Sequence, residues 1–321
     1  WTIDNGICGS TTDEVRILVH DAANPIADAG PDQELCTPIT GTSLQGSALT
    51  SPATGQWVLI GGTGDIADPT DPNSAVTGLS VGENVFEWTV NNGPCANGVT
   101  SSMVSIFVYD ELDPVADAGP DQQLCTSNGS TTMAGSSVSV PATGQWTLVS
   151  GTGTITDPSD PNTAITGLSV GQNIFQWTVN NGPCVNGLTT DQMSIFVFDP
   201  DNPLANAGGD QSICTSAGNT ITLEGSNVIF PATGLWTVSG GPANIVTPTS
   251  PTTLVTDLAT GSYTFTWTVN NGVCPDPISS SSSIVVVADG SAQPAEAGPD
   301  QQLCDVTATA VMAANAPTGV A

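Results

Sequence analysis

Short stretches in which apolar and polar residues alternate recur along this chain. In the clearest one, Phe86, Trp88 and Val90 alternate with Glu87 and Thr89. A period of two residues predicts a β-strand with one face buried and the other in water. The same alternation returns twice, at Phe175, Trp177 and Val179, and at Phe265, Trp267 and Val269.

Two further apolar patterns accompany each of these strands. One begins at a tryptophan, as in Trp57 and Leu59, and the other closes the unit, as in Val104, Ile106 and Val108. Gly, Pro, Asn and Asp steps separate them, which is typical of turns, and no segment has a helical stripe. About seven short strands per unit predict an all-β fold, a tandem array of Ig-like antiparallel β-sandwich domains. The predicted core tryptophans are Trp57, Trp88, Trp146, Trp177, Trp236 and Trp267.

The chain is built from repeats of 89 or 90 residues. The phrase Ala-x-Ala-Gly-x-Asp-Gln-x-x-Cys begins at Ala27, Ala116, Ala205 and Ala295, and Trp-Thr-Val-Asn-Asn-Gly-x-Cys begins at Trp88, Trp177 and Trp267. Such self-similarity indicates stacked copies of one folding unit. We expect complete Ig-like repeats over 24–112, 113–201 and 202–291, with the C-terminal part of a truncated repeat at 1–23 and the N-terminal part of another at 292–321. The sequence therefore reads as a slice of a longer array.

Each repeat carries two cysteines at constant positions. Their regular placement, without metal-type Cys-x-x-Cys spacing, predicts disulfides and an oxidising compartment. Pairing within repeats would join Cys36 to Cys95, Cys125 to Cys184 and Cys214 to Cys274, and would leave Cys8 and Cys304 for residues outside the slice. Pairing across junctions would join Cys8 to Cys36, Cys95 to Cys125, Cys184 to Cys214 and Cys274 to Cys304. We favour pairing within repeats, because a unit that folds alone is stabilised most by its own disulfide.

The charge balance excludes several functions. The chain has 30 Asp and Glu residues against one basic residue, Arg16, and a formal net charge of −29. Such a charge repels the phosphates of nucleic acids and anionic lipids, so we expect no nucleic-acid partner. No run of 18 apolar residues is present, so we predict no direct membrane insertion in this segment. We expect an extracellular location.

Catalytic chemistry finds little support in the sequence. The single histidine, His20, occurs once in an array of equivalent units, so we predict no catalytic residues and no enzyme. We expect no cofactor, although carboxylates at a junction can bind calcium. The calcium candidates are Asp110, Asp113, Asp117 and Asp121. Against them, Asn206 replaces Asp117 in the next copy.

The last strand of the repeat is apolar on its second face as well. Phe107 and Tyr109, and their counterparts Phe196 and Phe198, form that face. Apolar residues on both faces indicate that the strand is covered on both sides, or that it meets another domain or chain. Two interpretations stay open, proximity to the domain junction and lateral contact between chains in a fibre. We favour the first.

Several phrases resemble one family of repeats. These are Ala-Asp-Ala-Gly-Pro-Asp-Gln (27–33 and 116–122), Thr-Gly-Gln-Trp (54–57 and 143–146) and Trp-Thr-Val-Asn-Asn-Gly-Pro-Cys (88–95 and 177–184). They look like the Ig-like repeats of giant Bacteroidetes cell-surface proteins, which include SprB-type gliding-motility adhesins exported by the type IX secretion system. The opening phrase is also similar to polycystic kidney disease (PKD) domains. Their Trp-Asp-Phe-Gly-Asp-Gly signature is missing, and Gln56-Trp57-Val58-Leu59 stands in its place.

The resemblance implies a repeat-built extracellular adhesin or filament. We expect a repeat segment of a long secreted bacterial cell-surface adhesin, which acts as an extended multivalent stalk for surface attachment or gliding. Its expected partners are other copies of the same array, or surface polymers and glycans. The linker prolines Pro25, Pro114 and Pro203 would limit bending. Two alternatives remain, a structural extracellular polymer of laterally packed chains and the spacer array of a larger secreted enzyme.

Overall fold

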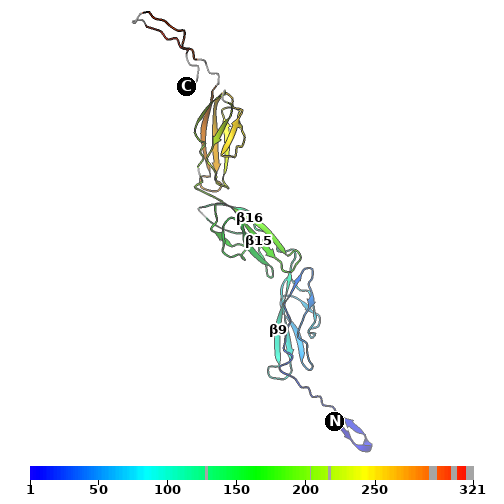
Figure 1. The fold of residues 1–321 in the computed structure, drawn as a ribbon. Coiled ribbons are helices and arrows are strands. Elements are labelled where there is room, and N and C mark those ends of the chain that lie inside the picture. Colours follow the sequence, from blue (N-terminus) through cyan, green and yellow to red (C-terminus); the bar gives the residue numbers. More distant parts are fainter. Residues whose placement is uncertain (127–128, 203, 216–217, 289–294, 305–308, 316–321) are drawn as a thin grey trace.

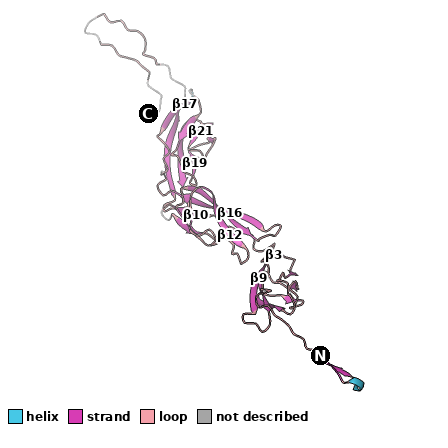
Figure 2. Ribbon diagram, turned by 60° about the horizontal axis from the view of Figure 1, so that its bottom comes forward, coloured by secondary structure: helices cyan, strands magenta, loops and turns pink. Residues whose placement is uncertain are grey.

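The protein consists of three β-sandwiches strung end to end (Figure 1). The computed structural model describes residues 1–126, 129–202, 204–215, 218–288, 295–304 and 309–315. A short 3₁₀ turn, η1 (Gly6–Cys8), lies near the N-terminus, and strands dominate the three domains (Figure 2). The predicted fold class, a tandem array of Ig-like β-sandwiches, is confirmed.

The chain starts with a small exposed hairpin. Strands β1 (Thr2–Asp4) and β2 (Ser10–Thr12) pair antiparallel around η1. None of the twelve residues from Trp1 to Thr12 is buried. An extended segment leads from this hairpin to the first sandwich (Figure 1).

Each sandwich has seven strands within the described residues. The first domain contains β3 (Gln33–Cys36), β4 (Thr42–Ser43), β5 (Thr54–Gly61), β6 (Asp65–Ile66), β7 (Ala75–Thr77), β8 (Gly82–Asn91) and β9 (Val99–Tyr109). The second contains β10 (Gln122–Cys125), β11 (Ser130–Thr132), β12 (Thr143–Ser150), β13 (Thr154–Ile155), β14 (Ala164–Thr166), β15 (Gly171–Asn180) and β16 (Leu188–Phe198). The third contains β17 (Gln211–Cys214), β18 (Ile221–Glu224), β19 (Thr233–Ser239), β20 (Asn244–Ile245), β21 (Thr252–Thr256), β22 (Gly261–Asn270) and β23 (Ile278–Ala288).

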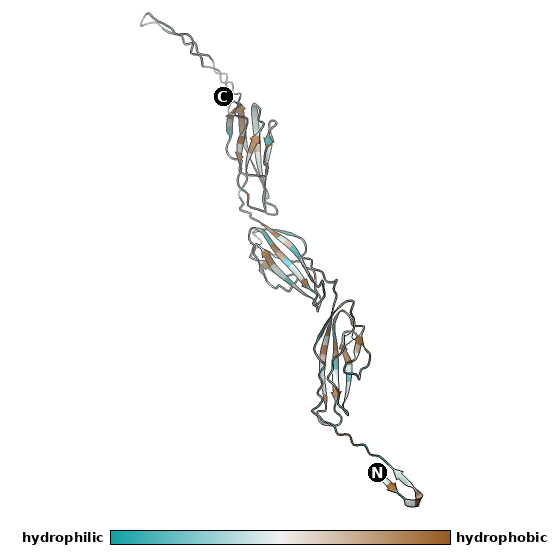
Figure 3. Ribbon diagram, turned by 45° about the vertical axis from the view of Figure 1, so that its right-hand side comes forward, coloured by the Kyte–Doolittle hydropathy of each residue, from teal (hydrophilic) through white to brown (hydrophobic). Residues whose placement is uncertain are grey.

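Two sheets face each other in every domain. In the first domain a four-stranded sheet has the order β3-β9-β8-β5, and a three-stranded sheet has the order β4-β7-β6. The other two domains repeat this topology. All neighbours are antiparallel except the first and last strands of each domain, which pair in parallel. Hydrophobic segments lie on the strands (Figure 3). Alternate residues of the long strands, as in β5 and β8, are buried.

A pair of tryptophans fills the core of each domain. Trp57 lies directly opposite Trp88 in the β5–β8 ladder, with ring centroids 4.9 Å apart. The Nε1–H of Trp57 donates to the Pro72 carbonyl and that of Trp88 to the Ser47 hydroxyl, both at 3.2 Å, so neither buried donor lacks a partner. The equivalent pairs are Trp146 with Trp177, and Trp236 with Trp267. All six side chains are buried.

The parallel pairing of first and last strands decides where the cysteines lie. In β3, Cys36 is opposite Tyr109, the final residue of β9, whereas Cys95 lies in the β8–β9 hairpin before β9 begins. An aspartate supports this pairing, because Asp32 Oδ1 accepts the Ser105 amide at 2.8 Å. Since β9 has 11 residues at roughly 3.4 Å each, its ends are about 34 Å apart. We call the hairpin end of a domain its head and the Cys36 end its tail.

A glycine in each core gives a test of the packing. A Cβ atom on Gly234 would overlap the indole ring of Trp267, whereas a Cβ atom on Gly209 of the same domain would meet nothing within 4 Å. We expect Gly234→Ala to destabilise the third domain by roughly 1–3 kcal/mol, as overpacked cores do. This destabilisation would be measured as faster hydrogen exchange of the β19 and β22 backbone amides. Gly209→Ala is the control, and equal exchange rates in the two variants would contradict the described core.

Candidate functional site at the domain junctions

Disulfides join successive domains. Cys36 at the tail of the first domain is bonded to Cys184 in the head hairpin of the second, with Cα atoms 5.5 Å apart. Cys125 at the tail of the second domain is bonded to Cys274 in the head hairpin of the third, at 5.1 Å. The chain is therefore fastened to itself at both junctions, across sequence separations of 148 and 149 residues.

This connectivity corrects the predicted pairing within repeats. Cys36 with Cys95, Cys125 with Cys184, and Cys214 with Cys274 are each the tail and head cysteines of one domain. They are separated by the length of the last strand, about 34 Å, far beyond the Cα separation of roughly 4.4–6.8 Å that a disulfide spans. The alternative pairing of cysteines adjacent in sequence, such as Cys184 with Cys214, is not formed either. In the described part of the chain, the free cysteines are Cys8, Cys95, Cys214 and Cys304.

The head hairpin is built by the phrase Asn-Asn-Gly-x-Cys. In the second domain, Asn180 Oδ1 accepts the Gly182 amide at 3.0 Å and shapes the turn. Asn181 Nδ2 donates to the Pro114 carbonyl at 3.0 Å and holds the linker against the hairpin. Cys184 carries the disulfide. Three residues of the repeated phrase thus have separate roles: Asn180 shapes the loop, Asn181 holds the linker and Cys184 bonds the preceding domain.

An aromatic ring from the preceding tail covers the glycine of the head hairpin. Gly182 has φ +63°, and a Cβ atom there would lie 2.5 Å from the Tyr109 ring. Phe198 covers Gly272 in the same way at the second junction, and His20 covers Gly93 at the head of the first domain. Only glycine allows both the backbone conformation and the close approach.

Of the four aromatic residues considered for lateral contact between chains, two are buried and so are not available for it. Tyr109 and Phe198 are 8% and 7% exposed, because the next domain of the same chain covers them. Phe196 is half-buried and makes an edge-on contact with Phe230 of the third domain, with ring centroids 6.1 Å apart. Phe107 is half-buried as well. Tyr109, Phe196 and Phe198 thus fit proximity to the junction, the first of the two interpretations.

Polar contacts complete the first junction. The Tyr109 hydroxyl donates to Glu34 Oε1 at 3.1 Å, and Asn186 Nδ2 donates to Glu111 Oε1 at 2.9 Å. Burial raises the pKa of Tyr109 above its ordinary value of 10.0, and the hydrogen bond and negative charge of Glu34 raise that pKa further. The second junction is more apolar, because Phe198 and Ala232 pack around the disulfide between Cys125 and Cys274.

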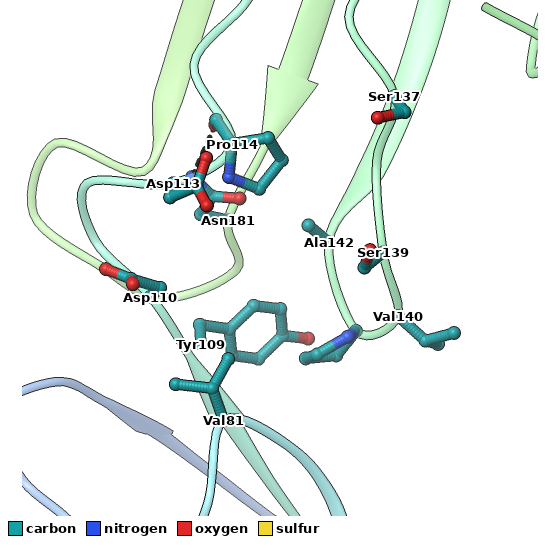
Figure 4. Close-up of a pocket in the computed structure, with 11 residues that line it drawn as sticks. Val81, Tyr109, Asp110, Asp113, Pro114, Ser137, Ser139, Val140, Ala142 and Asn181 are labelled. Carbon is teal, nitrogen blue, oxygen red and sulfur yellow. Dashed lines mark hydrogen bonds between the residues drawn. The ribbon is translucent and has the colours of Figure 1, made fainter.

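A cavity of about 360 Å³ lies beside the first junction (Figure 4). Val81 and Tyr109 come from the first domain, and Val140 and Pro141 come from the second. Asp110, Asp113, Pro114 and Asn181 line the same space along the linker side. The Asn181 Oδ1 atom is buried and has no hydrogen-bond partner. Pro25 and Pro114 follow cis peptide bonds in their linkers, and Pro203 lies outside the described residues.

Three of the four calcium candidates accept a hydrogen bond from a backbone amide with one carboxylate oxygen. Asp110 Oδ1 accepts the Leu112 amide at 3.0 Å, Asp117 Oδ1 the Gly119 amide at 2.8 Å, and Asp121 Oδ1 the Ser194 amide at 2.7 Å. Asp113 lines the cavity. Among the residues that the structure describes, no three His, Cys, Asp or Glu side chains gather as a metal site. The acids of the repeated phrase thus shape turns and hold the first strand of the domain.

His20 lies against the head hairpin of the first domain. It stands where Tyr109 and Phe198 stand at the later junctions, with its Nδ1 buried and without a partner. In the described residues, no helix has the length and apolar character needed to cross a membrane. The sequence reasoning named Tyr109 and Phe198 near the junction, but it missed the equivalent place of His20 and the role of the Asn-Asn-Gly turn. Both features recur at equivalent positions of successive repeats, and this recurrence could have indicated them.

Curated proteins with similar sequences include mammalian ones. No family model matches the chain. It is 26% identical over 247 residues to the human dyslexia-associated protein KIAA0319, a match that covers 70% of this chain and 22% of that protein. The mouse KIAA0319-like protein is 27% identical over 268 residues, which cover 77% of this chain and 25% of the relative. The chain therefore spans about a quarter or less of the length of these curated relatives.

Solved structures with similar folds are immunoglobulin, PKD and cadherin domains. The PKD domain of the KIAA 1837 protein is 31% identical, and the match covers 28% of this chain and 92% of that domain, with a TM-score of 0.24. Immunoglobulin domains 1–5 of Sidekick-1 are 13% identical, and the match covers 82% of this chain and 59% of that one, with a TM-score of 0.34. The sheet topology of each repeat is by itself that of an Ig-like β-sandwich.

The disulfide connectivity can be checked directly. We expect proteolysis under non-reducing conditions, followed by mass spectrometry, to find peptides that join Cys36 to Cys184 and Cys125 to Cys274. Cleavage at acidic residues and with chymotrypsin is needed, because the chain has a single Arg and no Lys. Recovery of a peptide that joins Cys36 to Cys95 would contradict the described junction.

The glycine beneath Tyr109 can be tested against a matched glycine. We expect Gly182→Ala to displace the Tyr109 ring and, because burial is the main cause of its raised pKa, to lower that pKa toward 10.0. Ultraviolet titration of tyrosinate would measure it in a chain with only two tyrosines. Gly171→Ala is the control, because Gly171 also has positive φ but nothing lies within 4 Å of its Cβ position. An unchanged titration in Gly182→Ala would refute this junction packing.

Proposed function

We propose that this chain is a segment of a long extracellular stalk, whose domains are coupled so that tension passes around the sandwich cores. The observation that carries the proposal is the bond from the tail of one domain to the head of the next. Tandem Ig- and PKD-like domains provide length, and the disulfides make that length hard to extend. The adhesion-type array expected from the sequence is the setting in which such a property is useful.

The route of force follows from the connectivity. Tension that arrives along the first strand of domain one reaches Cys36 and passes through the disulfide to Cys184. It continues along β16 and the following linker to β17, which ends at Cys214. The strands between Cys36 and Cys184 lie outside this route. Unfolding of those strands therefore adds little length to the stalk while the bond is intact.

Two attachments hold each junction. The first is the linker, which Asn181 anchors through the Pro114 carbonyl, and the second is the disulfide between Cys36 and Cys184. Two covalent connections at different points restrict bending and twisting more than one flexible linker does. The ring of Tyr109 fills the space between the domains. The three sandwiches accordingly form one extended body in Figure 1.

The biological setting that best fits is a secreted bacterial cell-surface adhesin or filament. This finer assignment is supported by the resemblance of the repeat phrases to Bacteroidetes surface proteins, with attachment or gliding as the use of the stalk. The net charge of −29 keeps such a stalk soluble and separate from anionic surfaces. Repetition gives multivalent contact with surface polymers, glycans or other copies of the array.

Single-molecule pulling tests the mechanical proposal. In a chain with Cys125→Ser and Cys274→Ser, only the bond between Cys36 and Cys184 remains. We expect its fully stretched length to be about 500 Å shorter in oxidising than in reducing buffer, since 148 residues are bypassed at roughly 3.3–3.6 Å each. Adding Cys36→Ser and Cys184→Ser gives the control, for which reductant changes nothing. Equal lengths in both buffers for the first variant would overturn the proposal.

The cellular location is tested separately. We expect antibodies against this chain to label the outside of intact producing bacteria, and short protease treatment of whole cells to remove the label. Labelling only after the cells are opened would contradict the surface-adhesin assignment. It would leave the mechanical result untouched.

A further inference from the structure

We propose that the cavity beside the first junction binds a lysine side chain of a basic partner protein. The ammonium group lies against the linker, and the aliphatic stem lies between the two domains. This inference goes beyond the stalk function, because it assigns a kind of partner to one junction. It rests on the lining of the cavity and not on the route of force, so either proposal can fail without the other.

The linker side of the cavity offers hydrogen-bond acceptors. Asp110 and Asp113 line it with carboxylates, and Asn181 lines it with an amide (Figure 4). Asn181 is 1% exposed, and its Oδ1 has no hydrogen-bond partner. The orientation of this amide is fixed, because its Nδ2 donates to the Pro114 carbonyl. A buried acceptor without a partner favours a ligand that brings donors, and an ammonium group carries three donors and no acceptor.

The other side of the cavity is apolar. Val81 and Tyr109 form it from the first domain, and Val140 and Pro141 form it from the second. The Tyr109 hydroxyl donates to Glu34, so it does not compete for the acceptors on the linker side. A cavity of about 360 Å³ is far larger than one metal ion, and its apolar side offers such an ion no ligands. A lysine has a four-carbon stem for the apolar side and a charged head for the acids.

At the second junction the chain itself fills the equivalent space. Asn202 stands at the linker position of Asp113, is 6% exposed, and accepts the Ile229 amide with its Oδ1 at 3.1 Å. Ile229 corresponds to Ser139, because both accept the amide of the alanine three residues later, and Ser139 lines the cavity at the first junction. The third domain thus buries a neutral amide where the second domain has a carboxylate beside a cavity. This difference singles out the first junction as the one that takes a cationic ligand.

The ammonium group must come from another molecule. The chain has no Lys, and its one basic residue, Arg16, precedes the first domain. A second copy of this sequence brings no lysine either, whereas a net charge of −29 attracts basic proteins. Val81 and Val140 are 53% and 79% exposed, so they can contact the peptide that carries the lysine. Charge complementarity therefore favours a basic protein as the occupant.

Titration of the full chain, followed by nuclear magnetic resonance, tests the site. The probe is N-acetyl-lysine methylamide, and the same compound acetylated on its side-chain nitrogen is the neutral control. We expect the lysine probe to cause saturable shifts of the Asn181 side-chain amide signals and of the Val81 and Val140 methyl signals. The neutral compound should cause none. Shifts that do not saturate, or equal shifts with both compounds, would overturn the proposal.

A pair of variants separates the site from general attraction to an acidic chain. Asp113→Asn gives the second domain the residue of the third and should weaken binding of the lysine probe by roughly fivefold or more, because it removes a charge-assisted hydrogen bond. Glu87→Gln removes the same charge from the first domain, outside the cavity, and should leave binding unchanged. Equal binding by the two variants would refute the site.

Two further probes distinguish a lysine of a protein from other cations. We expect n-butylammonium chloride to bind more weakly than the lysine probe, because it lacks the peptide groups that contact Val81 and Val140. Tighter binding of n-butylammonium would indicate a site for a free amine. Displacement of the lysine probe by an equal or lower concentration of calcium chloride, at constant ionic strength, would indicate a metal site. Either result would overturn the proposal.

Discussion

The parallel pairing of the first and last strands is the constraint on which the rest of this structure depends. It aligns β3 with the end of β9, so that Cys36 emerges beside Tyr109 at the tail of the domain. The other cysteine of the repeat lies in the hairpin that precedes β9, a strand length away. Each domain therefore carries one cysteine at each end, and a disulfide can form only with a neighbour. Covalent coupling of the array follows from the register of four residues in β3.

Much of the fold could be predicted from local pattern. Alternation of period two marks a buried strand wherever it occurs, and Phe86, Trp88 and Val90 are buried as that pattern requires. The disulfides could not be predicted in the same way, because pairing depends on where strands distant in sequence meet. A domain can be stabilised by its own disulfide only where its two cysteines lie close together in the fold. Cys36 and Cys95 lie at opposite ends of β9, so they cannot form one.

The junction shows how one short phrase can serve several physical purposes. In Asn180-Asn181-Gly182, the first residue shapes the turn, the second holds the linker, and the third leaves room for a ring from the preceding domain. The acids near the junction have a similar structural use, since Asp117 and Asp121 accept backbone amides. Residue type alone suggested calcium ligands. Only the hydrogen bonds reveal which oxygens are already occupied.

The overlap of the two disulfide loops has a consequence for durability. One loop runs from Cys36 to Cys184 and the other from Cys125 to Cys274, so every peptide bond between Cys36 and Cys274 lies inside at least one loop. A protease that cuts any one of these bonds leaves both fragments covalently attached. The exposed turns that connect the strands can thus be nicked without loss of the distal part of the molecule. A single cut in this region would therefore nick the array without dividing it.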